Sequence, residues 1–96
     1  MFVAPEDYDD VGLALDKRLI QRPAATFFLR AAGASPEADV KDGDLLVVDR
    51  AEPPAPGRVI VAVMRGELVV RRLPPGWRED DGVELWGVVL WTVRRP

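Results

Sequence analysis

Ser35 is the only serine in the chain, and it stands in the loop sequence GASP, residues 33–36, directly after a β-favouring run. A serine hydroxyl becomes a nucleophile when a neighbouring base accepts its proton. Histidine and cysteine are both absent, which excludes a Ser-His-Asp triad, a thiol nucleophile and the common zinc sites. A lone loop serine without such a base is most often a turn residue. Ser35 therefore needs a lysine or a carboxylate nearby if it is to do chemistry.

Two lysines, Lys17 and Lys41, are the only ammonium groups among the 13 basic side chains. Lys41 is the one near Ser35 in sequence, and it directly precedes the turn sequence Asp-Gly-Asp at residues 42–44. Asp39 is a conceivable carboxylate base on the same loop, but a weak one. The candidate chemistry is thus restricted to one hydroxyl, one nearby lysine and carboxylates.

The overall composition excludes several classes of protein. A net charge of −3 argues against a general nucleic-acid binder, whose domain normally carries a basic excess. No apolar run approaches the roughly 20 residues that a membrane span needs, and the acidic start of the chain is unlike a signal peptide. The lack of cysteine fits a reducing compartment. We therefore expect a cytoplasmic protein without a cofactor, a metal, direct nucleic-acid binding or a membrane.

Residues 1–14 show no periodic pattern and are expected to form an extended N-terminal arm, followed by a single domain at residues 15–96. A short helical segment is expected to begin at Asp16 and to end at Pro23, because proline cannot continue a helix. The rest of the chain is predicted to be mostly β.

Apolar, β-favouring runs separated by turn signals predict five strands. They are Thr26–Ala32, Leu45–Asp49, Arg58–Met64, Glu67–Leu73 and Val83–Val93. The two residues Arg65 and Gly66 predict a tight hairpin between the third and fourth of these strands. In the last strand both faces are apolar, so it needs cover on both sides. Gly87 in its middle predicts a bulge or a close backbone approach, and Trp86 and Trp91 are expected in the core or at a dimer interface.

Three stretches carry a resemblance to a known family: residues 23–51, 57–73 and 84–95. They read PAATFFLRAAGASPEADVKDGDLLVVDRA, GRVIVAVMRGELVVRRL and ELWGVVLWTVRR. In order and spacing they resemble the LexA/UmuD family of S24 peptidases. In that family a Ser-Gly-Asp-Ser-Met motif bears the nucleophilic serine, and a hairpin presents the catalytic lysine as Gly-Glu-x-x-Val-Lys-x-Leu. The resemblance implies a LexA/UmuD-type fold of twisted antiparallel strands with one short helical turn near the N-terminus.

The resemblance puts Ser35 at the position of the nucleophile and Arg71 at the position of the lysine base. The residues around the serine depart from the motif at Ala32, Ala34 and Pro36, and the loop that follows is one residue shorter. The departure at Arg71 matters most, because a guanidinium, with a pKa above about 12, does not give up its proton in a protein.

Arg71 is therefore expected to orient Ser35 or to pair with a nearby carboxylate or carbonyl, but not to act as the base. An equally weighted alternative is that Arg71 and Arg72 are charges that protect a sheet edge from aggregation. Lys41 lies on the loop rather than on the hairpin, so using it as the base demands a different geometry.

The resemblance implies a catalytically inactive accessory subunit, similar to the processed form of UmuD-type members. Such a subunit forms a homodimer and binds an error-prone translesion DNA polymerase, and it also contacts the recombinase filament, in the SOS response to DNA damage. One alternative is a self-processing S24 peptidase with Ser35 as nucleophile and Lys41 as base. The other is a degenerate LexA-like regulator.

Overall fold

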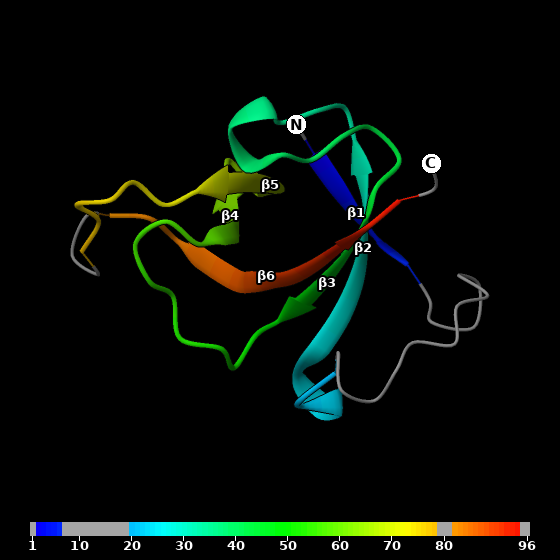
Figure 1. Ribbon diagram of the computed structural model, residues 1–96, viewed down its shortest axis with the longest axis horizontal. Helices are drawn as coiled ribbons and strands as arrows, with labels where there is room; N and C mark the ends of the chain where they lie inside the picture. The colour runs from blue at the N-terminus through cyan, green and yellow to red at the C-terminus, as the bar shows by residue number, and fades with distance from the viewer. Residues whose placement is uncertain (1, 7–19, 79–81, 95–96) are drawn as a thin grey trace.

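The computed structural model describes residues 2–6, 20–78 and 82–94 of the chain. Within these residues the strands form a closed antiparallel barrel in the order β1-β2-β3-β6-β4-β5 (Figure 1). The strands are β1 (Phe2–Glu6), β2 (Thr26–Ala32), β3 (Leu45–Asp49), β4 (Val59–Met64), β5 (Glu67–Arg72) and β6 (Leu85–Val93). Two 3-10 turns, η2 (Pro23–Ala25) and η3 (Pro36–Ala38), lie before and after β2. The predicted mostly β fold is confirmed.

The strand boundaries follow the predicted ones closely. β2 and β3 have the predicted limits, and β4, β5 and β6 are one or two residues shorter. β4 starts late because the N–H of Arg58 donates to the carbonyl of Ala55 at 3.1 Å and so belongs to a turn. The predicted hairpin is confirmed, since Arg65 and Gly66 both have positive φ, 53° and 77°, as a tight connection between twisted strands requires.

The N-terminal segment contributes a strand that the sequence pattern did not predict. Of the expected arm, the structure describes residues 2–6, which are extended and pair with β2 from Phe2 opposite Ala32 to Glu6 opposite Phe28. Pro5 and the lack of alternation hide this strand from a periodicity argument. The helical segment expected from Asp16 falls in residues 7–19, outside the described residues.

Pro23 begins a helical turn where it was expected to end one. It is the first residue of η2, a position where proline fits because the first turn of a helix needs no N–H bond. Neither helical turn in the described part of the chain is long and apolar enough to cross a membrane.

The barrel interior is a hydrophobic cluster to which every strand contributes. Its buried members are Val3, Leu29, Ala31, Ala38, Val40, Leu46, Val48, Val61, Val70 and Val89. A second cluster lies on the other face of β4, β5 and β6 and comprises Ile60, Ala62, Val69, Leu73 and Val88. Both faces of β6 are apolar and were expected to need cover. The second cluster covers part of one of these faces.

β6 is covered on both faces in its middle and loses that cover toward its end. Val88 and Val89 point to opposite faces and are both buried. Trp86 is half-buried, with Phe27 edge-on at 5.4 Å and the Arg50 guanidinium 4.5 Å above its ring. Trp91, in contrast, is 47% exposed, which leaves it accessible on the barrel surface. A dimer interface at these tryptophans stays a prediction.

Gly87 lies where β6 passes closest to β3, as the sequence predicted. A Cβ atom at Gly87 would stand 2.6 Å from Val48 Cγ1 and 3.4 Å from the carbonyl oxygen of Asp49. The register of the β3–β6 pair shifts between Val47 and Val48, beside this contact. Glycine is required here for space.

We predict that Gly87→Ala lowers the free energy of unfolding by about 1–3 kcal/mol, because the methyl group forces Val48 out of its place. Gly76→Ala is the matched control, since a Cβ atom there meets nothing within 4 Å, and it should stay within about 0.5 kcal/mol of wild type. Urea unfolding measures both. Equal stability of the two variants would contradict the close approach.

A buried carboxylate joins η2 to the end of β3. Asp49 is fully buried; its Oδ2 accepts a hydrogen bond from Arg22 Nη1 at 2.8 Å. Its Oδ1 accepts the backbone N–H groups of Ala51 and Glu52 at 2.7 and 3.1 Å. Burial acts to raise the pKa of Asp49, but the bonds from Ala51, Arg22 and Glu52 outweigh it and hold the pKa below its usual value.

Because the pKa of Asp49 is lowered by folding, the ionised carboxylate stabilises the protein above the unfolded pKa of about 3.9. That stability is lost as the pH falls from there through the folded pKa. We predict that Asp49→Asn costs about 1–3 kcal/mol at pH 7 and that the difference from wild type shrinks below about pH 4. Urea unfolding at several pH values tests this.

Glu52→Gln is the control and should show a smaller effect, because Glu52 contacts Arg22 from a more exposed position. If the stability lost in Asp49→Asn did not change with pH, the lowered pKa of Asp49 in the folded protein would be refuted.

Candidate functional site

Ser35 is buried at the start of the loop that follows β2. It is 8% exposed, and it forms an isolated bridge with Val40 in which the Ser35 N–H donates to the Val40 carbonyl at 2.8 Å. The return bond, from the Val40 N–H to the Ser35 carbonyl, is 3.1 Å. The bridge closes a small loop around η3. The Ser35 side chain makes no capping hydrogen bond to η3, so the turn does not use its hydroxyl.

The predicted Asp-Gly-Asp turn at residues 42–44 ties this loop back to the end of β2. Asp42 Oδ1 accepts the N–H of Gly33 at 2.8 Å, and the Gly43 N–H donates to the Ala31 carbonyl at 2.9 Å. Gly43 has a φ of 85°, which favours glycine at this position. The turn therefore fixes both sides of the loop that carries Ser35.

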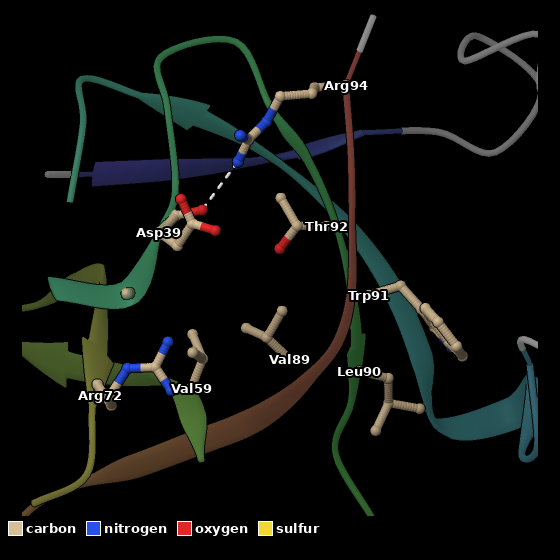
Figure 2. A pocket seen from close by; sticks show the side chains of 9 residues that line it. Asp39, Val59, Arg72, Val89, Leu90, Trp91, Thr92 and Arg94 are labelled. Carbon is tan, nitrogen blue, oxygen red and sulfur yellow. Dashed lines mark hydrogen bonds between the residues drawn. The ribbon is translucent and has the colours of Figure 1, made fainter. Parts of the chain in front are cut away.

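A buried ion pair joins the same loop to the end of β6. The Asp44 side chain is 3% exposed, and Arg94 binds it through Nε to Oδ1 at 3.1 Å and Nη2 to Oδ2 at 2.8 Å. Arg94 Nη2 also donates to the carbonyl of Asp39 at 2.8 Å, the bond drawn in Figure 2. Asp44 Oδ2 additionally accepts the Lys41 N–H at 2.8 Å. Sequence reasoning assigned Asp44 only to a turn and gave Arg94 no role.

Arg71 lies beside the serine loop and contacts Glu37. Arg71 Nη1 stands 3.9 Å from Glu37 Oε1, and its Nη2 stands 3.6 Å from Met64 Sδ. Glu37 lies in η3, two residues after Ser35. Of the two expected roles, pairing with a nearby carboxylate is thus the one that the geometry of Arg71 provides. Its side chain is 53% exposed, so this pair contributes little to stability.

The neighbouring Arg72 points to the other face of β5 and binds main-chain carbonyls. Its Nε donates to Glu37 O and its Nη1 to Gly57 O, both at 2.8 Å. Alternation along β5 explains why two adjacent arginines reach different sides of the same loop. Both arginines contact η3, and the alternative that they protect a sheet edge stays a prediction. Sequence reasoning missed the role of Arg72, since nothing in the pattern distinguishes it from Arg71.

The side chains of the alternative bases, Lys41 and Asp39, make no hydrogen bond to Ser35 in the structure. Lys41 is exposed, and its contacts with the described residues are made by its main chain, to Asp44. Asp39 is also exposed and has a left-handed φ of 55°, with its carbonyl held by Arg94. Within the described residues no group of three acidic side chains is arranged to hold a metal ion. The site therefore consists of a buried serine, a nearby arginine and a loop held by ion pairs.

Comparison with known proteins identifies the family. A family model described as Peptidase S24-like matches residues 3–86. The chain belongs to the S24 peptidase-like family. The match covers the serine loop, the β4–β5 hairpin and the start of β6, the same parts that carry the resemblance in the sequence.

The similar proteins include UmuD-like members of this family. Protein ImpA of Escherichia coli is 54% identical over 68 residues, which cover 70% of this chain and 47% of ImpA. Protein MucA of Escherichia coli is 33% identical over 106 residues, 92% of this chain and 73% of MucA. The LexA repressor of Cellvibrio japonicus is 38% identical over 65 residues, 67% of this chain and 32% of that repressor. The chain spans about half the length of the first of these relatives. The LexA/UmuD resemblance is confirmed.

We predict that Arg94→Gln loosens the serine loop, because it leaves the buried Asp44 carboxylate without its counter-charge. The expected loss is about 1–3 kcal/mol of stability, with faster amide hydrogen exchange at Ser35 and Val40. Arg58→Gln is the control, since the Arg58 side chain makes no hydrogen bond to the described residues. Unchanged exchange at Ser35 and Val40 in Arg94→Gln would show that the ion pair does not hold the loop.

Proposed function

We propose that this chain is a UmuD′-like accessory subunit without peptidase activity, which binds a translesion DNA polymerase in the SOS response. The proposal rests on Arg71, which the resemblance puts at the position of the family's lysine and which contacts Glu37 in the structure. A Ser-Lys pair works only if the lysine loses its proton to accept one from the serine. A guanidinium keeps its proton, so Ser35 has no base at this position.

The size of this loss decides between an enzyme and a binding subunit. A general base contributes about 10²–10⁴-fold to rate, and here it also activates the nucleophile. We do not assign this role to the exposed Lys41, because its side chain makes no hydrogen bond or ion pair with Ser35 in the described residues.

Family membership supports the rest of the proposal. The relatives ImpA and MucA are UmuD-like, which supports a role in SOS mutagenesis. We extend this to a homodimer that binds an error-prone polymerase subunit and the recombinase filament. Co-purification of the chain with the host polymerase supports this role; a chain that binds no polymerase subunit favours the LexA-like regulator instead.

We predict that the wild-type chain gives no product when incubated at alkaline pH with a substrate containing a UmuD-type cleavage site. Arg71→Lys should restore measurable cleavage, because it supplies an amine that accepts the serine proton. Product formation is followed by mass spectrometry.

Two matched variants control this experiment. Arg72→Lys makes the same change on the opposite face of β5 and should stay inactive. The double variant Ser35→Ala with Arg71→Lys should also be inactive. Cleavage by the wild-type chain that Ser35→Ala abolishes would overturn the proposal in favour of an active peptidase.

A further inference from the structure

β6 has a strand partner on only one side over its second half. β3 pairs with β6 from Val88 to Val93, whereas β4 pairs with it only from Leu85 to Val88. From residue 89 to residue 93, therefore, one edge of β6 has no strand beside it among the described residues. The unpaired N–H and C=O groups of such an edge are a template on which another extended segment adds as a strand.

The edge is open because the chain turns away from β6 before Val59. The preceding loop, residues 51–57, contains three prolines, which have no N–H to donate to a ladder. Gly57 and Arg58 instead pair with Leu73 beyond the end of β5, through bonds of 2.9 Å each. The gap beside β6 therefore arises because Gly57 and Arg58 extend the pairing with the β5 side of the hairpin instead of pairing with β6.

A cleft of about 510 Å³ lies along this open edge. Its walls come from η3 and the adjoining Asp39, from β6, and from the facing ends of β4 and β5. Figure 2 shows Val89 and Thr92 turned toward Asp39 and Arg72, whereas Trp91 projects away from them. The cleft is therefore lined by a sheet edge, a few apolar side chains and charged groups, a combination that suits a peptide.

Two arginines line the cleft, and they differ in whether a carboxylate neutralises their charge. Arg94 is neutralised by the buried Asp44, so it is part of the fold. Arg72 binds two carbonyls through Nε and Nη1, and no carboxylate of the described residues stands within ion-pair distance of it. Its Nη2 donates to none of the described residues. Arg72 thus presents a fixed cation to the cleft without a counter-charge.

We propose that the open edge of β6, residues 89–93, binds an extended segment of a partner protein by strand addition, with an Asp or Glu side chain of that segment on Arg72. Main-chain bonds to β6 supply affinity, and the carboxylate supplies selectivity because a charge-assisted bond to a held guanidinium is strong and directional. The proposal goes beyond the accessory role and does not depend on whether Ser35 is active.

A second copy of this chain fits the cleft less well than an acidic partner does. β6 contains no Asp or Glu between Leu85 and Val93, so two copies paired edge to edge would bring no carboxylate from β6 to Arg72. The occupant is therefore expected to differ in sequence from β6.

The test uses the full chain and a random heptapeptide library displayed on phage. We expect enriched peptides to combine β-branched residues with an Asp or Glu. In fluorescence anisotropy, replacing that acid by its amide should weaken binding to the unaltered chain by about tenfold or more. N-methylation of alternate peptide residues should abolish binding, and the bound peptide should protect the amides of residues 89–93 from hydrogen exchange.

On the protein side, Arg72→Gln should weaken binding by a similar factor. Arg65→Gln makes the same charge change on the exposed β4–β5 turn and should leave the dissociation constant within about twofold. The proposal is overturned if no peptide is enriched, if the acid-to-amide change has no effect, or if protection appears elsewhere. It is also overturned if residues 89–93 become protected at high protein concentration without peptide, which would make a second copy the occupant.

Discussion

A buried carboxylate must find both donors and a counter-charge, and Asp44 obtains them in a way that positions the whole serine loop. The carboxylate accepts a backbone N–H from Lys41 and is bound by Arg94, which also holds the Asp39 carbonyl. The last residues of the described chain are thereby fixed to the loop that begins at Ser35. The loop contains three residues of 3-10 helix and packs Ala38 and Val40 into the core, and this polar network adds fixed bonds on its other side.

The serine loop and the β4–β5 hairpin contact each other through η3. Ser35 keeps a buried position, and the β4–β5 hairpin still brings a basic residue to η3. An arginine suits this place because its guanidinium forms planar, directional bonds that an ammonium does not. Arg71 and Arg72 thus supply contacts between β5 and η3.

Local patterns predicted most of the barrel because its strands are short, apolar and separated by strong turn signals. β2, β3, the Arg65–Gly66 hairpin and the close approach at Gly87 all follow from residue type and spacing. β1 did not, because Pro5 and an irregular pattern conceal a strand whose partner lies more than 20 residues away. In the site, the predicted roles of Ser35 and Arg71 rest on motif positions and stay predictions. The roles of Arg94 and Arg72 were not predicted, since their partners are main-chain carbonyls and a carboxylate brought near only by the fold.

The place of β6 in the barrel also determines how the chain can fold. The strand order divides the described part of the chain into β1-β2-β3 and the β4–β5 hairpin, and β6 lies between them. Apart from β6, strand pairing among the described residues joins the two parts only where Phe2 lies opposite Val69, two residues far apart in the chain, and Arg72 of β5 adds a bond to the Glu37 carbonyl in η3. Contacts of such long sequence separation make a barrel slow to form. β6 pairs with both parts, so the strand that completes the barrel also forms a wall of the cleft.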